Sequence, residues 1–303
     1  MVKYVYPWAD ERPKGECALA LGFFDGVHAA HRNLIITAKA EAEKRGLPLG
    51  IFTFNSDSGI KSDIKRLYND SEKLEMLEKL GADFVVSADF DSIKGLCPED
   101  FVKSCLVSDV GCTLCVAGFN FRFGHKAAGD SDQLVKLMRE SGGDAVIEEE
   151  LKIDGKTVSA TEIRGLIESG DVKSAKALLG TPYFIEGTVA HGNSVGHTLG
   201  YPTVNIELPE ERVRPARGVY RSSVTIDGTA YTALTNIGVC PTFESRSEHA
   251  ETYILDFSGD LYERRVRVYL LDFLREEKKF TSADELLSQI EKDKIQALRE
   301  NGE

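Results

Sequence analysis

The sequence predicts an α/β protein with a parallel sheet, followed by a smaller antiparallel β-barrel and a terminal helix. In the first half, short apolar strands alternate with helical segments, which is typical of a parallel sheet with helices on both faces. From Tyr183 on, short strands follow one another between glycine and aspartate turns, which is typical of an antiparallel sheet or barrel. The 303 residues have room for two domains, and we predict them at 1–181 and 182–303.

The elements of the first domain follow from the spacing of apolar residues. Strands are expected at 17–21, 49–54, 84–87 and 113–117, and helices at 31–45, 71–80 and 99–106. Residues 161–179 add two short helical patterns, which Gly170 and Asp171 interrupt. Parallel sheets of this kind bind ligands at the carboxyl ends of their strands, near the point where strand order reverses.

The second domain is read from shorter segments. Strands are expected at 184–190, 219–226, 229–234 and 252–257. A final helix follows, with Leu286, Leu287, Ile290 and Ile295 on an apolar face. The domain boundary is expected near Gly180 to Tyr183.

Composition narrows the class of function. Apolar residues make up 42% and charged residues 28%, which is a globular balance. The net charge of -12 argues against lasting nucleic-acid binding, which depends on Lys and Arg, and favours small phosphorylated metabolites. We expect no membrane span, because no run of roughly 18 apolar residues exists. The N-terminus is not a signal peptide, so a cytoplasmic enzyme is expected.

The six cysteines are scattered along the chain. Cys112 and Cys115 form a C-x-x-C inside the apolar run at 113–117, and no second pair completes a zinc site. Small buried thiols in a reducing compartment are therefore the favoured interpretation. A metal or redox role is the alternative.

A glycine-bounded turn after the first predicted strand is the first candidate site. It runs Gly22-Phe-Phe-Asp-Gly-Val-His28 and ends in H-x-x-H, with His31 three residues on along a predicted helix. Histidines add donors to the free amides of a helix N-terminus, which makes a phosphate site. A pair of surface histidines is the alternative, and no third ligand for zinc is evident. The candidate residues are Gly22, Phe24, Asp25, Gly26, His28 and His31.

Two further segments offer groups for a nucleotide. The run Gly118-Phe-Asn-Phe-Arg-Phe-Gly124 lets backbone approach a ligand, and Asn120 adds donors and an acceptor. Ser159, Thr161 and Arg164 open a predicted helix with two hydroxyls and a guanidinium. An ordinary aromatic loop, and an N-cap with a surface arginine, are the alternatives.

The second domain carries a glycine-rich run that leads to a rigid Pro-Thr-x-Asn. Gly192, Gly196 and Gly200 suit a loop around phosphates, and Thr203 and Asn205 offer oxygen ligands to Mg²⁺. A long hairpin loop is the alternative. Glu251, before the strand at 253–257, is a lone acid of the kind that is usually solvated.

Taken in order, these segments resemble the bacterial bifunctional riboflavin kinase/FMN adenylyltransferase family, also called FAD synthetase. The resemblance covers nearly the whole chain. It includes the runs at 22–28, 178–183, 236–243, 256–262 and 273–280. It implies an N-terminal nucleotidyltransferase-type domain and a C-terminal riboflavin kinase barrel.

The resemblance also implies two reactions. One ATP phosphorylates riboflavin to FMN, and a second ATP adenylylates FMN to FAD. In the kinase half, Glu251 matches the family's general base, and Thr203 and Asn205 match its Mg²⁺–nucleotide ligands. In the other half, His28 and His31 are expected to stabilise phosphate charge, aided by Asn120, Ser159, Thr161 and Arg164. The partners expected are riboflavin, FMN, FAD and ATP, and self-association is left open.

The first half departs from the family pattern more than the second. Ser56-Asp57-Ser58 stands where the family usually carries Pro-His-Pro, which removes a phosphate donor and adds a negative charge. Ala30 replaces a glycine and Ala160 a hydroxyl residue; Val204 for alanine and Thr181 for arginine are milder. The alternative function is therefore a riboflavin kinase with a weak or inactive adenylyltransferase domain. A third hypothesis, a non-enzymatic flavin- or nucleotide-binding module, conflicts with intact Thr203, Asn205 and Glu251.

Overall fold

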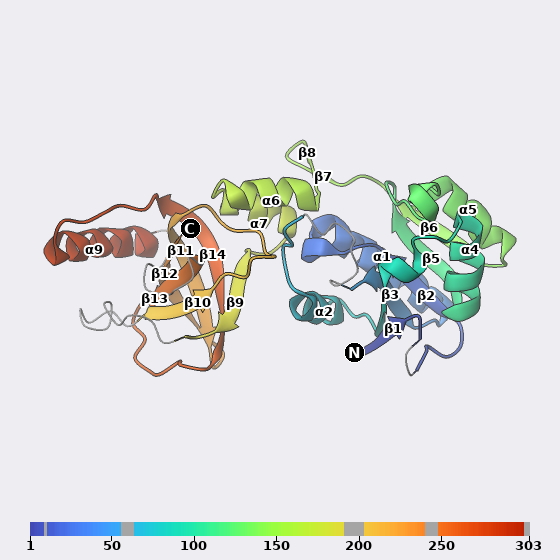
Figure 1. Cartoon of the computed structure of the whole chain (residues 1–303), viewed down its shortest axis with the longest axis horizontal. Helices are drawn as coiled ribbons and strands as arrows, with labels where there is room; N and C mark the ends of the chain where they lie inside the picture. The colour runs from blue at the N-terminus through green and yellow to red at the C-terminus, as the bar shows by residue number, and fades with distance from the viewer. Residues whose placement is uncertain (9–10, 56–63, 191–202, 240–247, 300–303) are drawn as a thin grey trace. The chain divides into compact units, whose positions relative to one another are not determined.

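The computed structural model describes residues 1–8, 11–55, 64–190, 203–239 and 248–299. The chain forms two compact units, Met1–Ala160 and Thr161–Glu303, each built on a six-stranded sheet (Figure 1). The predicted fold class is confirmed: a parallel sheet with helices precedes an antiparallel barrel and a terminal helix. No helix in the described part of the chain has the length and apolar character needed to cross a membrane.

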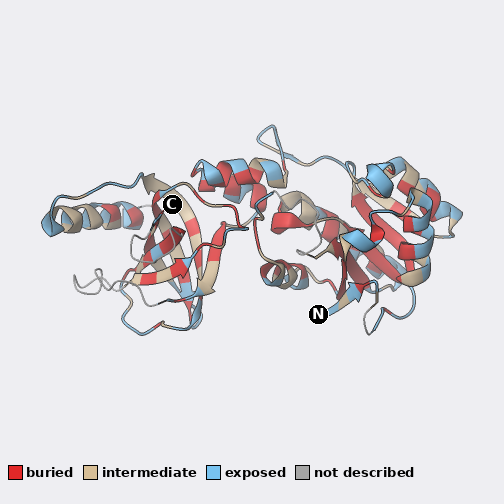
Figure 2. Ribbon diagram, in the orientation of Figure 1, coloured by how far each residue is buried: buried red, intermediate tan, exposed pale blue. Residues whose placement is uncertain are grey.

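The sheet of the first unit is parallel throughout. Its order is β1-β4-β3-β2-β5-β6. β2 (Cys17–Leu21) and β4 (Phe84–Ala88) are buried at every residue, as expected for inner strands covered on both faces (Figure 2). The remaining strands are β1 (Val2–Tyr6), β3 (Leu49–Phe54), β5 (Cys112–Gly118) and β6 (Asp144–Glu148).

Both edge strands were absent from the sequence prediction. β1 pairs with β4 over all five of its residues, from Val2 opposite Phe84 to Tyr6 opposite Ala88. β6 pairs with β5 in the same direction. Edge strands are partly exposed and carry polar residues, so their apolar pattern is too short to predict a strand.

Capping residues fix the ends of the two main helices. α1 (Ala29–Arg45) ends at Gly46, whose φ of 65° lets its N–H reach the carbonyls of Ala42 and Glu43. α2 (Asp70–Lys79) begins with a capping box between Asn69 and Glu72. Both predicted helices are confirmed to within two residues.

The predicted helix at 99–106 is real but of a different type. Its first turn is α4 (Pro98–Asp100), and the chain then continues as a π-helical stretch, Phe101–Asp109. The unit also contains α3 (Phe90–Ile93), α5 (Ser131–Glu140) and the small hairpin β7 (Lys152–Ile153) and β8 (Lys156–Thr157).

The predicted burial of the C-x-x-C thiols is confirmed. Cys112 and Cys115 are buried in β5, and Cys17 lies opposite Cys112 on β2. Burial raises the pKa of the Cys105 thiol to about 12 and also raises that of Cys112. These thiols therefore stay protonated and behave as small apolar groups. Among the described residues, no group of three His, Cys, Asp or Glu side chains could hold a metal ion.

The second unit is a nearly closed antiparallel barrel. Its order is β10-β13-β12-β11-β14-β9. The two ends of the sheet approach where the Ala190 N–H donates to the Asn205 carbonyl oxygen at 3.0 Å. The strands are β9 (Phe184–Thr188), β10 (Thr203–Glu207), β11 (Gly218–Ile226), β12 (Thr229–Val239), β13 (Glu248–Ile254) and β14 (Arg265–Arg275).

Three fully buried hydroxyls show which side chains of the barrel point inward. The Thr235 Oγ1 lies 2.7 Å from the Ser222 Oγ and 3.0 Å from the Thr252 Oγ1. Because successive side chains of a strand point to opposite faces, Asn236 and Glu251 must lie on the outer face. The candidate catalytic carboxylate is thus outside the closed core.

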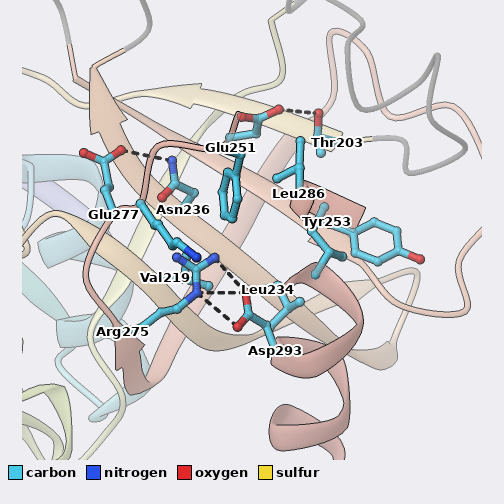
Figure 3. Close-up of a pocket in the computed structure, with 13 residues that line it drawn as sticks. Thr203, Val219, Leu234, Asn236, Glu251, Tyr253, Arg275, Glu277, Leu286 and Asp293 are labelled. Carbon is cyan, nitrogen blue, oxygen red and sulfur yellow. Dashed lines mark hydrogen bonds and ion pairs between the residues drawn. The ribbon is translucent and has the colours of Figure 1, made fainter. Parts of the chain in front are cut away.

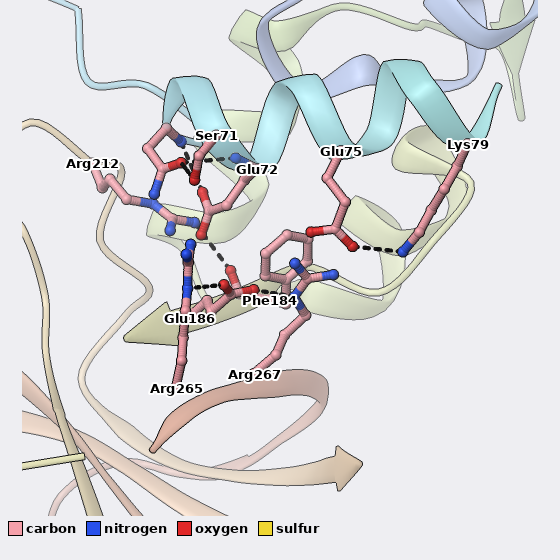
Figure 4. Close-up of polar contacts among 10 residues, drawn as sticks. Ser71, Glu72, Glu75, Lys79, Phe184, Glu186, Arg212, Arg265 and Arg267 are labelled. Carbon is pink, nitrogen blue, oxygen red and sulfur yellow. Dashed lines mark hydrogen bonds and ion pairs between the residues drawn. The ribbon is translucent and has the colours of Figure 1, made fainter. Parts of the chain in front are cut away.

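An ion-pair cluster holds the edge strand β9 against β14. Glu186 lies opposite Arg267 in the β9–β14 register and pairs with both Arg265 and Arg267 (Figure 4). The guanidinium carbon of Arg267 also lies 4.2 Å from the centroid of the Phe184 ring. These cross-strand contacts stabilise the pairing of β9, the last strand of the sheet, with β14.

Two short helices precede the barrel, as predicted. They are α6 (Ala160–Glu168) and α7 (Val172–Leu179). α6 accepts a hydrogen bond at the Ile167 carbonyl from the Ala216 N–H, and Lys173 on α7 pairs with Asp272 at 2.6 Å. These contacts group the helices with the barrel unit. The domains predicted from the sequence, 1–181 and 182–303, instead place both helices in the first domain. Which residues belong to each activity stays a prediction.

The terminal helix is α9 (Ala283–Arg299). Asp293 and Ala297 are its buried residues, whereas Ile295 is 49% exposed. The prediction that Ile295 shares the apolar face of Leu286 and Ile290 is therefore wrong. Five residues separate Ile295 from Ile290, which turns it about 140° around the helix.

Candidate functional site

The first candidate site lies where two neighbouring strands end. β2 and β5 are adjacent in the sheet, although β3 and β4 come between them in the chain. Strand order therefore reverses at this pair, the position at which parallel sheets bind ligands. The predicted turn at 22–28 follows β2, and the run at 118–124 begins in the last residue of β5. The structure thus brings the carboxyl ends that carry both segments side by side.

The turn after β2 is a tight 3₁₀ turn, Asp25–Val27. Phe24, Gly26 and Val27 all have positive φ, at 54°, 84° and 41°, a conformation that is strained for phenylalanine and valine. The Asp25 carboxylate is buried and accepts a hydrogen bond from the Leu67 N–H at 3.0 Å. Phe24 is fully buried, with its ring 5.1 Å from that of His31. Both side chains therefore support the turn from within.

Gly26 offers a test of how tightly this turn is packed. A Cβ at Gly26 would lie 2.4 Å from the Leu67 Cδ1, whereas a Cβ at Gly46, with similarly positive φ, would meet nothing within 4 Å. We expect Gly26→Ala to lower the free energy of unfolding by about 3 kcal/mol and Gly46→Ala by about 1 kcal/mol. Urea unfolding of both variants measures the difference. Equal losses would show that backbone strain alone matters at Gly26.

His28 caps α1 and stacks on His31. The His28 Nδ1 accepts from the His31 backbone N–H at 3.4 Å, and the two rings lie 3.6 Å apart at an angle of 14°. Because Nδ1 is the acceptor, the proton of the neutral His28 ring sits on Nε2, which is then a donor. His28 is buried and His31 half-buried. Imidazole donors beside the first amides of a 17-residue helix suit a phosphate group.

The other predicted residues for this site stand as follows. Asn120 is exposed just beyond β5, and a Cβ at Gly118 would lie 3.4 Å from its Oδ1. Ser159 is half-buried before α6, where Thr161 is exposed and Arg164 buried. A Cβ at Gly22 would meet the Phe24 ring at 3.1 Å. Their roles in nucleotide binding stay predictions, and Ser56 to Ser58 lie outside the described residues.

The second candidate site is a cavity of about 270 Å³ between the outer face of the barrel and α9 (Figure 3). Its walls are largely apolar. Polar groups enter from the strands, and Glu251 and Thr203 point toward each other. The residues that line this cavity include Thr203, Val219, Leu234, Asn236, Glu251, Tyr253, Arg275, Phe280, Leu286, Ile290 and Asp293.

A polar row crosses three strands at one side of this cavity. Glu251 on β13 lies opposite Asn205 on β10 and opposite Asn236 on β12. Thr203 is two residues before Asn205, and its Oγ1 donates to the Glu251 Oε1 at 3.0 Å. The structure therefore brings together three residues predicted from distant segments, Thr203, Asn205 and Glu251. Glu251 is exposed.

Several polar residues of the cavity were not predicted as site residues. Asn236 is one, and its Nδ2 donates to the Glu277 Oε1 at 3.4 Å. Arg275 and Asp293 form a bidentate ion pair, in which the Arg275 Nε and Nη2 reach the carboxylate at 3.0 and 2.8 Å. Asp293 also accepts from the Gln289 Nε2 at 2.9 Å, so it holds α9 against β14. Asn236 and Arg275 both lie in runs that carry the family resemblance, which was the available signal.

A second cavity, of about 550 Å³, shares Thr203 with the first. Val204, Phe257, Asp260 and Tyr262 are among its lining residues. Thr203 thus lines both cavities. The predicted phosphate loop residues Gly192, Gly196 and Gly200 lie outside the described residues.

Comparisons with known proteins match the two halves of the chain to two families. The FAD synthetase family model matches residues 10–162, and the riboflavin kinase family model matches residues 179–300. A bifunctional riboflavin kinase/FMN adenylyltransferase from Bacillus subtilis is 34% identical over 295 residues, covering 94% of this chain and 93% of the relative. The protein of the same name from Escherichia coli K12 is 33% identical over 293 residues, covering 95% and 93%.

A solved structure agrees over both units. The crystal structure of a protein named macrolide-efflux protein, from Streptococcus pneumoniae, is 30% identical, with a TM-score of 0.85. The match covers 97% of this chain and 98% of that one. On the two family matches and these full-length relatives, the chain belongs to the bifunctional riboflavin kinase/FMN adenylyltransferase family.

Proposed function

We propose that this chain phosphorylates riboflavin to FMN with one ATP and adenylylates FMN to FAD with a second. The observation that carries the proposal is that Thr203 and Glu251 bond to each other at the edge of an apolar cavity, with Asn205 opposite Glu251 on the neighbouring strand. A hydroxyl, an amide and an accessible carboxylate at that edge suit the transfer of a phosphoryl group to an alcohol.

The cavity under α9 suits the flat ring system of riboflavin. Val219, Leu234, Leu286 and Ile290 give it apolar walls, and Phe280 adds an aromatic surface. With the ring held there, Glu251 takes the proton of the 5′-hydroxyl. The hydroxyl oxygen then bonds to the γ-phosphorus of ATP, the bond from that phosphorus to the β-phosphate oxygen breaks, and ADP leaves. The neighbouring cavity at Thr203 is the place for the nucleotide.

The oxygen groups at this edge also fit a magnesium ion. The Thr203 hydroxyl, the Asn205 amide oxygen and the Glu251 carboxylate are the hard oxygen donors that Mg²⁺ prefers. Thr203 and Asn205 would hold it together with the phosphates of ATP. When bound, Mg²⁺ offsets the negative charge that develops on the phosphate oxygens.

Adenylyl transfer in the first unit needs no nucleophile from the protein. An oxygen of the FMN phosphate attacks the α-phosphorus of ATP, the α–β phosphoanhydride bond breaks, and pyrophosphate leaves. The protein must align the phosphates and stabilise their charge. The His28 Nε2–H, the His31 ring and the first amides of α1 are the donors that we propose for that task. Asn120, Ser159, Thr161 and Arg164 are expected to assist. A cytoplasmic location and self-association stay predictions.

Product analysis tests the proposal. Purified protein with ATP and Mg²⁺ is expected to form FMN and then FAD from riboflavin, and FAD when supplied with FMN. Chelation of Mg²⁺ with EDTA is expected to stop FMN formation. If the riboflavin reaction ends at FMN and the FMN reaction is silent, the chain is a riboflavin kinase whose first unit is inactive. Ser56-Asp57-Ser58 would explain that outcome, because this run lacks the family's histidine and adds a negative charge. If neither reaction gives a product, the chain is a non-enzymatic flavin- or nucleotide-binding module.

A further inference from the structure

We propose that Lys73 is a positioning residue for adenylyl transfer, because its buried ammonium ties the carboxyl ends of β2 and β3 to α2. The inference rests on the proposed function of the first unit. Lys73 belongs to none of the sequence motifs and takes part in no step of the two proposed reactions.

Lys73 joins three elements. It lies in the first turns of α2 and is 6% exposed. Its Nζ donates to the carbonyl oxygen of Phe54, the last residue of β3, at 3.1 Å, and lies 3.6 Å from the Asp70 carboxylate. It also lies 5.9 Å from the ring centroid of Phe23, two residues beyond β2. A single cation therefore contacts the ends of both strands.

Other contacts join the same two strand ends. The Thr53 Oγ1 donates to the Phe23 carbonyl oxygen at 3.0 Å, and the rings of Phe23 and Phe54 lie 6.5 Å apart. The Arg66 guanidinium lies 5.2 Å from the Phe23 ring. Phe23 leads directly into the strained turn that ends at His28. The position of the histidine donors therefore depends on how this group of side chains holds Phe23.

The charge of Lys73 matters as well as its shape. Burying an ammonium is unfavourable, and an apolar side chain would fill the same space without that penalty. In this structure the ammonium makes two contacts that an apolar side chain cannot make: it donates to the Phe54 carbonyl oxygen and pairs with the Asp70 carboxylate.

The pH dependence of adenylylation distinguishes charge from packing. Burial lowers the pKa of Lys73, and the charged groups that face it are Asp70 and Asp25, which oppose that shift, and Arg66, which adds to it. The protonated form is the one that pairs with Asp70 while it donates to the Phe54 carbonyl oxygen. Activity that needs it is therefore present below this lowered pKa and lost as the pH rises through it.

The test compares three full-length variants, each assayed for both reactions. We expect Lys73→Met to lower kcat/KM for ATP in FMN adenylylation at least tenfold and to raise the KM for ATP. Lys73→Arg is expected to stay within threefold of the unmodified chain and to remain active at higher pH, because guanidinium keeps its proton. Riboflavin phosphorylation, on the other unit, should stay within twofold in every variant. Lys79→Met is the control, since Lys79 lies exposed on the same helix and pairs with Glu75 (Figure 4).

Each other outcome overturns the proposal. Equal losses in Lys73→Met and Lys73→Arg would mean that a positive charge at this position is not what adenylylation needs. An identical alkaline limit in Lys73→Arg and the unmodified chain would mean that the proton of Lys73 does not set the pH dependence. The arginine comparison decides even if Lys73→Met does not fold. Normal adenylylation by a folded Lys73→Met would overturn this inference alone. A silent unmodified chain would overturn the proposed adenylyltransferase function with it.

Discussion

Glu251→Gln is expected to lower kcat for riboflavin phosphorylation by about 10²–10⁴-fold, the usual contribution of a general base. The glutamine keeps the size of the side chain and can still accept the hydrogen bond from Thr203, which is 3.0 Å long. It loses the ability to take the proton of the 5′-hydroxyl. Binding of riboflavin in the cavity under α9 should hardly change, so the loss should fall on kcat rather than on KM.

FMN adenylylation by the same variant is expected to be unchanged, because Glu251 belongs to the other unit. Glu207→Gln is the matched control: Glu207 is exposed on β10, is absent from the lining of both cavities and lies four residues beyond Thr203. Steady-state formation of FMN measures the effect. A Glu251→Gln variant that keeps more than a tenth of the activity would show that the hydroxyl is deprotonated by some other group.

His28→Asn is expected to lower FMN adenylylation by about 10²–10³-fold, as the loss of a donor aimed at developing charge does. We assign His28 two tasks, since its Nδ1 caps α1 and its Nε2 then carries the proton that can be donated to phosphate. Asparagine is a good N-cap residue, so it preserves the first task and shortens the reach needed for the second. The variant therefore separates catalysis from helix capping.

His28→Ala provides the comparison. It should lose as much adenylylation activity and in addition about 1 kcal/mol of stability, because the cap is gone. Riboflavin phosphorylation should be unaffected in both variants. His125→Asn, on an exposed 3₁₀ turn of the same unit, is the control. If His28→Asn restored full activity while His28→Ala did not, the histidine would act only through the helix end.

The sequence predicted inner strands and long helices well, because their apolar residues repeat over many positions. β2, with five buried residues, and α1, with Leu34, Ile35, Ala38 and Ala42 buried, are of this kind. Edge strands have no such signal: β1 carries Lys3 and the exposed valines Val2 and Val5, and only its pairing with β4 makes it a strand. Ile295 fails for another reason, since the direction of an apolar side chain depends on the helix phase and not on residue type.

In the candidate sites, too, the residues that belong to local patterns were predicted and the others were not. Short motifs predicted His28 and His31, Thr203 and Asn205, because each pair lies within one turn or one strand. Contacts between distant segments were beyond such patterns. Asp293 meets Arg275 from 18 residues away, and Lys73 meets Phe54 from 19 residues away. Nothing in either side chain's own neighbourhood in the sequence indicates its partner.

The Arg275–Asp293 pair has a consequence for the order in which the protein is made. Ribosomes release the first unit before the barrel, and domains generally fold as units during synthesis. The sheet that carries His28 is complete when residue 160 has emerged. The cavity of the second unit needs Asp293, which emerges much later. A nascent chain therefore completes the sheet of its first unit long before it can close the cavity under α9.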